Sequence, residues 1–74
     1  MTAEFLTLLQ RLNLFLRRKA TGNVKALAAR LNVHRATVYR NLNLLRNLGA
    51  EIAYDRERQT YYYANDFDLK NFFS

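Results

Sequence analysis

The segment from residue 24 to residue 49 constrains the fold more than any other part of the chain. Its first half has helical spacing, and the apolar residues share one face: Leu27, Ala28 and Leu31. Asn32 interrupts this spacing, and asparagine is one of the few residues besides glycine that tolerates a left-handed turn. Residues 35–48 regain the spacing, again with apolar residues on one face: Val38, Leu42 and Leu45. Since Gly49 is a natural helix stop, the segment predicts two helices joined by a tight turn.

The opposite face of the second helix is polar and basic. At about 100° per residue, these residues point away from the apolar face: Ala36, Arg40, Asn43 and Asn47. Thr37 and Tyr39 lie on either side of them, and Arg35 opens the helix. Arginine and asparagine match the edges of guanine and adenine in the major groove, and no acidic residue occurs between residues 24 and 50. This pattern favours a DNA-binding helix over a basic but inert surface.

His34 is the only histidine, and it stands directly before the second helix. We expect a neutral imidazole nitrogen to cap this helix by accepting a backbone N–H. Contact with a DNA phosphate is the alternative, and protonation in mild acid would strengthen such a contact.

Two strands are predicted after Gly49, over residues 51–54 and 60–64, because tyrosine and β-branched residues favour extended chain. Alternation places Tyr62 on one face of the second strand. Its neighbours Tyr61 and Tyr63 lie on the other face, and we expect one of these faces to pack on the helices.

The charged loop between these strands, residues 55–59, lacks the Asn-Gly signal of a tight hairpin and is expected to form a longer wing. Its basic residues, Arg56 and Arg58, are candidates for contact with a phosphate or the minor groove. Because Asp55 and Glu57 alternate with them, a solvated, self-paired loop is the alternative.

Residues 3–18 predict a further helix, which precedes the turn. Its apolar residues form a broad core-facing stripe: Phe5, Leu8, Leu9, Leu12, Phe15 and Leu16. We expect Thr2 to cap its start, and Leu14, which points away from the stripe, to be exposed or to lie at a subunit contact. Either Thr21 or Asn23 is expected to cap the next helix.

The tail, residues 65–74, is short and rich in large apolar side chains: Phe67, Leu69, Phe72 and Phe73. Asp66 or Asp68 is expected to cap a final helical turn. Four such side chains should not remain in water, so they either complete this domain's own core or bury against a second copy. We favour the second copy.

Composition bounds the function. The chain has 74 residues and a formal net charge of +6, so its partner is expected to be a polyanion, nucleic acid first and an anionic membrane second. No apolar run is long enough for a membrane span, and the absence of cysteine fits the cytoplasm. One histidine without cysteine predicts no metal site, and the isolated glycines predict no cofactor loop. We expect no enzyme activity.

The residues LAARLNVHRATVYRNLNLLRNLGAEI, followed by YDRERQTYYY, resemble the winged helix-turn-helix at the N-terminus of DeoR-type and WYL-domain bacterial transcription regulators. The run from Arg35 to Arg40 is the most specific part of this resemblance. His34 stands where serine is common in that family, and Ala36 where a second arginine is common. The ligand-sensing domain that usually follows is absent up to Ser74, so we expect control by concentration or by a protein partner.

The resemblance implies an α+β fold of three helices, a two-stranded wing and an apolar tail, which binds double-stranded DNA as a small regulator. We expect residues 1–74 to form one domain, divided into a helix-turn-helix (23–49), a wing (51–64) and the tail. The expected DNA contacts are His34, Arg35, Ala36, Thr37, Tyr39, Arg40, Asn43, Asn47, Arg56 and Arg58. Since one such module binds weakly, a homodimer on two half-sites is expected.

Two other functions remain open from the sequence. One is a protein-interaction module of the same fold, with Leu14, Leu44 and the tail as its contact surface. The other is a DNA-binding accessory factor of a recombinase or mobile element.

Overall fold

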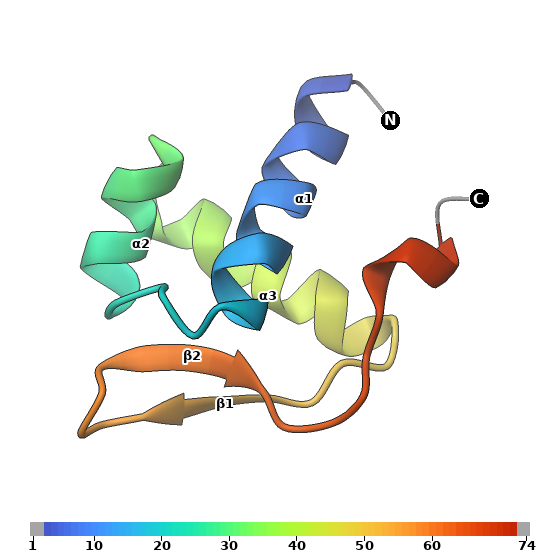
Figure 1. Ribbon diagram of the computed structural model, residues 1–74. Helices are drawn as coiled ribbons and strands as arrows, with labels where there is room; N and C mark the ends of the chain where they lie inside the picture. The colour runs from blue at the N-terminus through green and yellow to red at the C-terminus, as the bar shows by residue number, and fades with distance from the viewer. Residues whose placement is uncertain (1–2, 73–74) are drawn as a thin grey trace.

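Helices and a hairpin form where the sequence predicts them in the computed structural model, which describes the backbone of residues 3–72 and the side chains of residues 7–72. Figure 1 shows the three α-helices lying together above the hairpin. In chain order the elements are α1 (Ala3–Arg17), α2 (Val24–Leu31), α3 (Arg35–Asn47), β1 (Ile52–Asp55), β2 (Thr60–Tyr63) and the 3-10 helix η1 (Leu69–Phe72). Thr2 and Phe73 and the side chain of Phe5, all named in the sequence predictions, lie outside these described parts.

One face of each helix lines the buried core. The core leucines and their neighbours are Leu9, Leu12 and Leu16 of α1, Leu27, Ala28 and Leu31 of α2, and Val38, Leu42 and Leu45 of α3. Full burial of a leucine stabilises a fold by about 1.5–3 kcal/mol, so three such residues fix the rotation of α3 about its axis. Leu14 lies outside this core and is 47% exposed, as one of its two predicted environments requires.

The connection from α2 to α3 is the predicted left-handed turn. Asn23, and not Thr21, caps α2, since its side-chain oxygen accepts the N–H of Ala26 at 2.9 Å. Asn32 ends the helix with φ 57° and ψ 48°, the left-handed conformation that asparagine tolerates. The main-chain N–H of Val33 then donates to Ala28 at 3.0 Å, which closes the turn.

His34 occupies the position before α3, but its side chain makes no capping hydrogen bond. The predicted imidazole cap is therefore wrong. The preferred caps are the short side chains of Ser, Thr, Asp and Asn, whose oxygens reach back to the first turn, and the exposed imidazole ring does not do so. The main-chain carbonyl of His34 still begins the helix by accepting the N–H groups of Thr37 and Val38 at 3.0 and 3.2 Å.

Strands β1 and β2 pair antiparallel, with Ile52 opposite Tyr63 and Asp55 opposite Thr60. The four-residue turn between them confirms the expected longer loop. The Asp55 carboxylate shapes this turn, because it accepts the N–H groups of Glu57 and Arg58 at 3.0 and 3.1 Å. The observed strands begin one residue later in β1 and end one residue earlier in β2 than predicted.

The hairpin packs on the helices through the face that carries Tyr61 and Tyr63. On the other face, the Lys19 ammonium lies 5.5 Å from the centre of the Tyr62 ring. The loop between α1 and α2 fastens β2 from the side. Tyr61 donates its N–H to the buried Thr21 hydroxyl at 2.7 Å, and the N–H of Thr21 donates to the Thr60 hydroxyl at 3.2 Å.

The tail is split between core and surface. Asp68 caps η1 by accepting the N–H of Lys70 at 3.0 Å, and Phe67 and Leu69 are buried in the chain's own core. Phe72 is 46% exposed although its ring stacks on Phe67 at a centroid distance of 5.6 Å. Phe67 and Leu69 are therefore not available to pack against a second copy of the chain, which the favoured alternative required.

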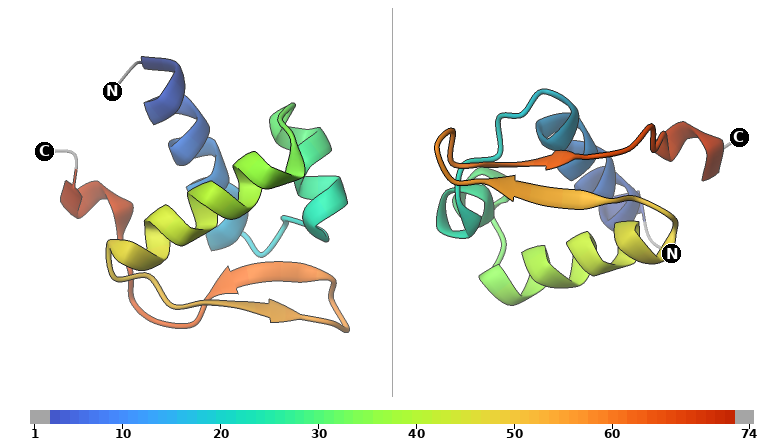
Figure 2. Two further views of the ribbon diagram at one scale, coloured as in Figure 1. Left: turned by 180° about the vertical axis from the view of Figure 1, so that it is seen from behind. Right: turned by 90° about the horizontal axis from the view of Figure 1, so that it is seen from below.

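The predicted α+β arrangement of three helices followed by a two-stranded antiparallel hairpin is confirmed. Figure 2 shows that α1 and α3 lie on opposite sides of the molecule, with β2 nearer α1 and β1 nearer α3. None of the helices in the described part of the chain has the length and apolar character needed to cross a membrane.

Candidate nucleic-acid interface

The apolar side of α3, with Val38, Leu42 and Leu45, is buried in the core, so the polar side of the helix faces outward. The exposed residues along this side are Ala36, Tyr39, Arg40, Asn43 and Asn47, with His34 and Arg35 exposed at the start of the helix. We call this set the α3 face; helix α3 itself crosses the front of the left view in Figure 2. From Ala36 to Asn47 it extends about 16 Å, at 1.5 Å per residue. Thr37, also predicted as a contact, is half-buried at its edge.

Arg46 connects the α3 face to the hairpin. One nitrogen of its guanidinium donates to the side-chain oxygen of Asn43, and the other donates to the carbonyl of Ile52 in β1, both at 3.2 Å. An asparagine that reads adenine must use its oxygen and its nitrogen together. Because an amide oxygen has two lone pairs, Asn43 can accept from an adenine while its oxygen still accepts from Arg46.

Asn41 belongs to the core and not to the α3 face. It is 4% exposed, and its amide nitrogen donates to the carbonyl of Thr37 at 2.8 Å. Its side-chain oxygen has no hydrogen-bond partner among the described residues. Its polar side chain gave no sign of burial in the sequence, but its spacing did: it lies three residues after Val38 and four before Leu45, on the buried side of α3.

Three tyrosines gather where α3 meets the hairpin. Tyr39 comes from α3, Tyr54 from β1 and Tyr61 from β2, and the rings of Tyr54 and Tyr61 have centroids 4.7 Å apart. Burial raises the pKa of Tyr61, and the neighbouring Tyr39 and Tyr54 phenols add to this rise. The Tyr61 hydroxyl therefore stays protonated at neutral pH and is a donor of the kind that DNA phosphates accept.

Only Tyr39 of this cluster was predicted as a contact. The signal for the other two lay in the hairpin register, which places Tyr54 directly opposite Tyr61. Sequence alternation gave the face of each tyrosine, but not the side of the molecule on which the pair meets α3.

The two wing arginines differ in their surroundings. Arg56 and Arg58 are both exposed at the turn. Arg58 also lines a shallow groove with Lys19 and Arg30, on the side of the molecule that carries α1. The structure thus gathers the predicted contacts of α3 on one face, whereas Arg58 lies at the edge of another.

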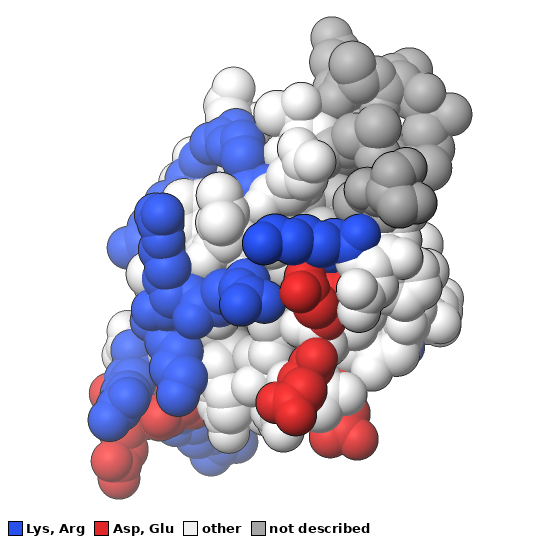
Figure 3. Space-filling view, turned by 45° about the vertical axis from the view of Figure 1, so that its right-hand side comes forward, with Lys and Arg blue, Asp and Glu red and all other residues white. Residues whose placement is uncertain are grey.

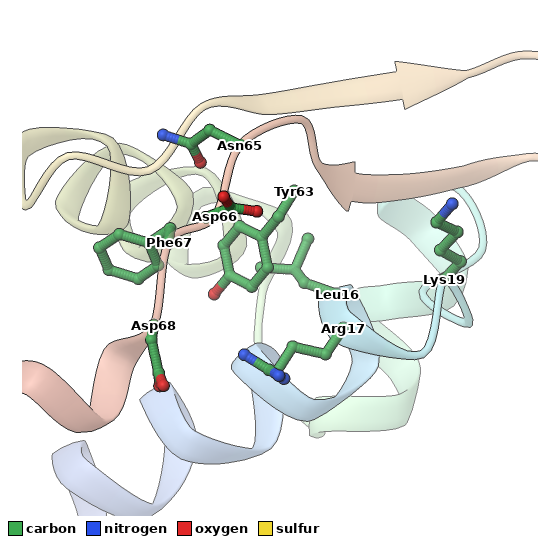
Figure 4. A pocket seen from close by; sticks show the side chains of 8 residues that line it. All are labelled: Leu16, Arg17, Lys19, Tyr63, Asn65, Asp66, Phe67 and Asp68. Carbon is green, nitrogen blue, oxygen red and sulfur yellow. The ribbon is translucent and has the colours of Figure 1, made fainter.

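A second depression, of about 380 Å³, lies between the end of α1 and the tail (Figure 4). Its lining mixes both charges, with Arg17 and Lys19 opposite Asp66 and Asp68. Tyr63 also lines it; its hydroxyl donates to Asn13 at 2.7 Å, and burial raises its pKa to about 12. The described side chains contain no group of three or more His, Cys, Asp or Glu that could hold a metal ion.

The fold and the outward polar side of its third helix define a winged helix-turn-helix domain. A family model described as an HTH domain matches residues 7–63, from α1 to the last residue of β2. The chain belongs to this family of helix-turn-helix domains, and membership indicates DNA binding. Neither a curated protein nor a solved structure matches the chain.

Proposed function

We propose that the chain binds double-stranded DNA in a sequence-specific manner, as a small transcriptional regulator like those of the DeoR and WYL type. The observation that carries this proposal is the α3 face. It presents Arg40, Asn43 and Asn47 to solvent on a helix without an acidic residue. The proposal places the protein at the nucleoid in the cytoplasm.

In the proposed complex, α3 lies in the major groove, which is about 12 Å wide and admits one helix. Arg40 and Asn43 contact base edges, with Thr37 beside them. Arg35 and Tyr39 donate to phosphates and set the register of the helix. The remaining predicted contacts at the edges of this site are His34, Ala36, Asn47 and Arg56, whereas Arg58 lines the groove on the side that carries α1.

Engagement of an adenine by Asn43 is compatible with the bond from Arg46, because the amide oxygen can accept a second hydrogen bond. A bidentate contact with the correct base is worth about 1–3 kcal/mol of discrimination. Through its bonds to Asn43 and Ile52, both 3.2 Å long, Arg46 orients the reading side chain and holds the hairpin against α3.

We further propose that residues 1–74 act as one domain and bind two half-sites as a homodimer. Among the described residues of the tail, Phe72 is about half-exposed and is available for such a contact. Regulation would follow from the concentration of the protein or from a partner that binds it.

Selection of bound duplexes from a random pool tests the proposal, because it reveals both sequence preference and half-site spacing. Arg40→Ala and Asn43→Ala should each relax the preference at particular base positions by about 1–3 kcal/mol. Arg17→Ala removes an arginine that is also exposed but lies outside the α3 face, and it is the matched control. If Arg40→Ala and Asn43→Ala weaken selected and scrambled duplexes equally, α3 does not read sequence.

A further inference from the structure

A second basic surface lies on the side of the molecule opposite the α3 face. Its cations come from α1, the following loop and α2: Arg11, Arg18, Lys19 and Arg30. We call this set the α1 basic face, and Arg58 of the wing lies at its edge. Figure 3 shows Lys and Arg side chains gathered along one side of the molecule in this region.

The cations of the α1 basic face line two adjoining hollows. Lys19, Arg30 and Arg58 line a groove between the α1–α2 loop and the wing. Arg11 and Arg18 line a smaller hollow on α1, together with two apolar side chains. Phe15 is common to both hollows, which makes the basic surface continuous from α1 to the wing.

Two of these guanidinium groups are held in place. Arg11 donates to the carbonyl of Arg30 at 2.8 Å, and Arg30 donates to the carbonyl of Ala20 at 2.6 Å. A guanidinium has five N–H donors, so one such bond fixes its position and leaves donors that can face a ligand. Arginines held in this way lose less conformational entropy when they bind a phosphate.

Carboxylates border this surface without lining it. Neither hollow has an Asp or Glu among its lining residues. Glu57 shares the turn with Arg58, while Asp66 and Asp68 line the separate depression beside the tail. The charge of the α1 basic face is therefore uncompensated within it.

The two basic surfaces cannot serve one straight duplex. Since α1 and α3 lie on opposite sides of the molecule (Figures 1 and 2), a straight duplex along α3 does not also lie along α1. We propose that the α1 basic face binds the sugar–phosphate backbone of a second duplex, so that one copy of the chain bridges two duplexes. This inference rests on the proposed function, in which the α3 face holds the first duplex.

The chemistry of the α1 basic face favours a phosphate backbone over a protein partner. Although arginine is common in protein interfaces, a protein partner would have to supply carboxylates that match each of these cations, whereas a phosphate backbone carries negative charge along its whole length. It carries no asparagine or glutamine among its lining residues except Gln59 at the wing, so it is suited to binding without base reading. A second segment of duplex is also the polyanion at the highest local concentration around a DNA-bound protein.

A capture experiment tests the bridge. The selected duplex is fixed to beads and saturated with the protein, and a labelled duplex of unrelated sequence is then added. The test variant is Arg11→Gln with Arg18→Gln, and the matched control is Arg17→Gln with Lys70→Gln, which removes the same charge beside the tail. Two phosphate contacts with a salt slope of about 0.9 each correspond to roughly a 60-fold loss of second-duplex affinity at 0.1 M salt.

We expect the test variant to lose capture while its affinity for the bead-bound duplex and its melting temperature remain those of the wild type. The control should capture normally. Because Arg11 also bonds to α2, Arg18→Gln alone is the second variant if the double variant fails to fold; it should lose roughly 8-fold.

Three results overturn the bridge. In the first, the wild type binds its selected duplex but captures no second duplex. In the second, the test variant captures the labelled duplex as well as the wild type does, because the α3 face of a second copy binds it. The third result is that no second duplex is captured, but the test variant binds a single long duplex more weakly than the wild type does. In that case one bent duplex contacts both faces. Failure of the proposed function looks different: selection from the random pool yields no preferred sequence.

Discussion

The α3 face and the α1 basic face differ in what lies between their cations. On the α3 face, Arg40 is accompanied by the Asn43 amide and the Tyr39 phenol. On the α1 basic face, Arg11 and Arg18 are accompanied by Leu14 and Phe15, which offer no hydrogen bond. Both surfaces attract polyanions, but only the first carries the donors and acceptors that distinguish one base pair from another. Under the proposed function, the polar groups beside Arg40, and not positive charge alone, distinguish the α3 face as the surface that reads sequence.

The largest effect on both faces is expected from a substitution in the core that holds α1 and α3 in position. Leu45→Ala should lower the free energy of unfolding by about 2–5 kcal/mol, because Leu45 is fully buried in the seam of α3. Such a loss is a large part of the stability of a small domain, so both duplex binding and capture should fall together. Thermal melting followed by circular dichroism measures it. Leu14→Ala, at a half-exposed site, is the control, and equal melting of the two variants would show that α3 is rotated from this position.

An exchange of arginine for lysine tests whether the two faces bind DNA differently, because it keeps the positive charge and removes the planar guanidinium. Arg40→Lys should lose about 1–3 kcal/mol of discrimination between selected and scrambled duplexes, since lysine does not pair with guanine in the same bidentate geometry. Arg18→Lys should leave second-duplex capture nearly unchanged, because a phosphate backbone requires only the charge. Competition binding at fixed salt measures both. Equal sensitivity of the two positions would contradict the division of roles.

The smallest expected effect is a change in stability at alkaline pH, which we assign to Tyr63 where β2 meets α1. Burial raises the pKa of Tyr63 from 10.0 to about 12, so folding favours the protonated phenol. The resulting stabilisation is complete below pH 10 and is lost as the pH rises from 10 towards 12. Because Tyr63 is only partly buried, the loss should be well below the value that the full shift implies.

Tyr63→Phe removes the ionisable group and should therefore flatten the fall in stability at alkaline pH. It also removes the hydrogen bond to Asn13, which lowers stability at neutral pH by about 0.5–1.5 kcal/mol. Urea unfolding at pH 9 and pH 11 measures both effects. An equally steep alkaline loss in the variant and the wild type would assign it to another group.

The α3 face could be predicted because its information is local. The spacing of Val38, Leu42 and Leu45 sets which side of the helix is buried, and the outward residues follow from helical geometry. The turn at Asn32 could be predicted for the same reason, because the tolerance for the left-handed conformation is a property of the asparagine itself. The one local prediction that failed, the His34 cap, depended on the direction of a side chain and not on backbone or period.

The rest depended on contacts between distant parts of the chain. Arg11, Arg18 and Arg30 are separated in sequence, and each has an ordinary explanation on its own helix, so their assembly into one surface appears only when α1 packs on α2. The bond from Arg46 to Ile52 likewise depends on the path of the hairpin, which the sequence of α3 does not determine. In the tail, sequence could not decide between two burial sites for Phe67, because hydrophobicity favours burial without naming the partner.

The hydrogen bonds that hold the hairpin to the helices also affect the open edges of its sheet. A two-stranded sheet has two open edges, and an open edge can recruit a strand from another molecule. Here the Thr21 hydroxyl takes up the Tyr61 N–H at the outer edge of β2, and the Arg46 guanidinium covers the Ile52 carbonyl at the outer edge of β1. The contacts that set the wing against the helices therefore also blunt both edges, and they do so with side chains from outside the sheet.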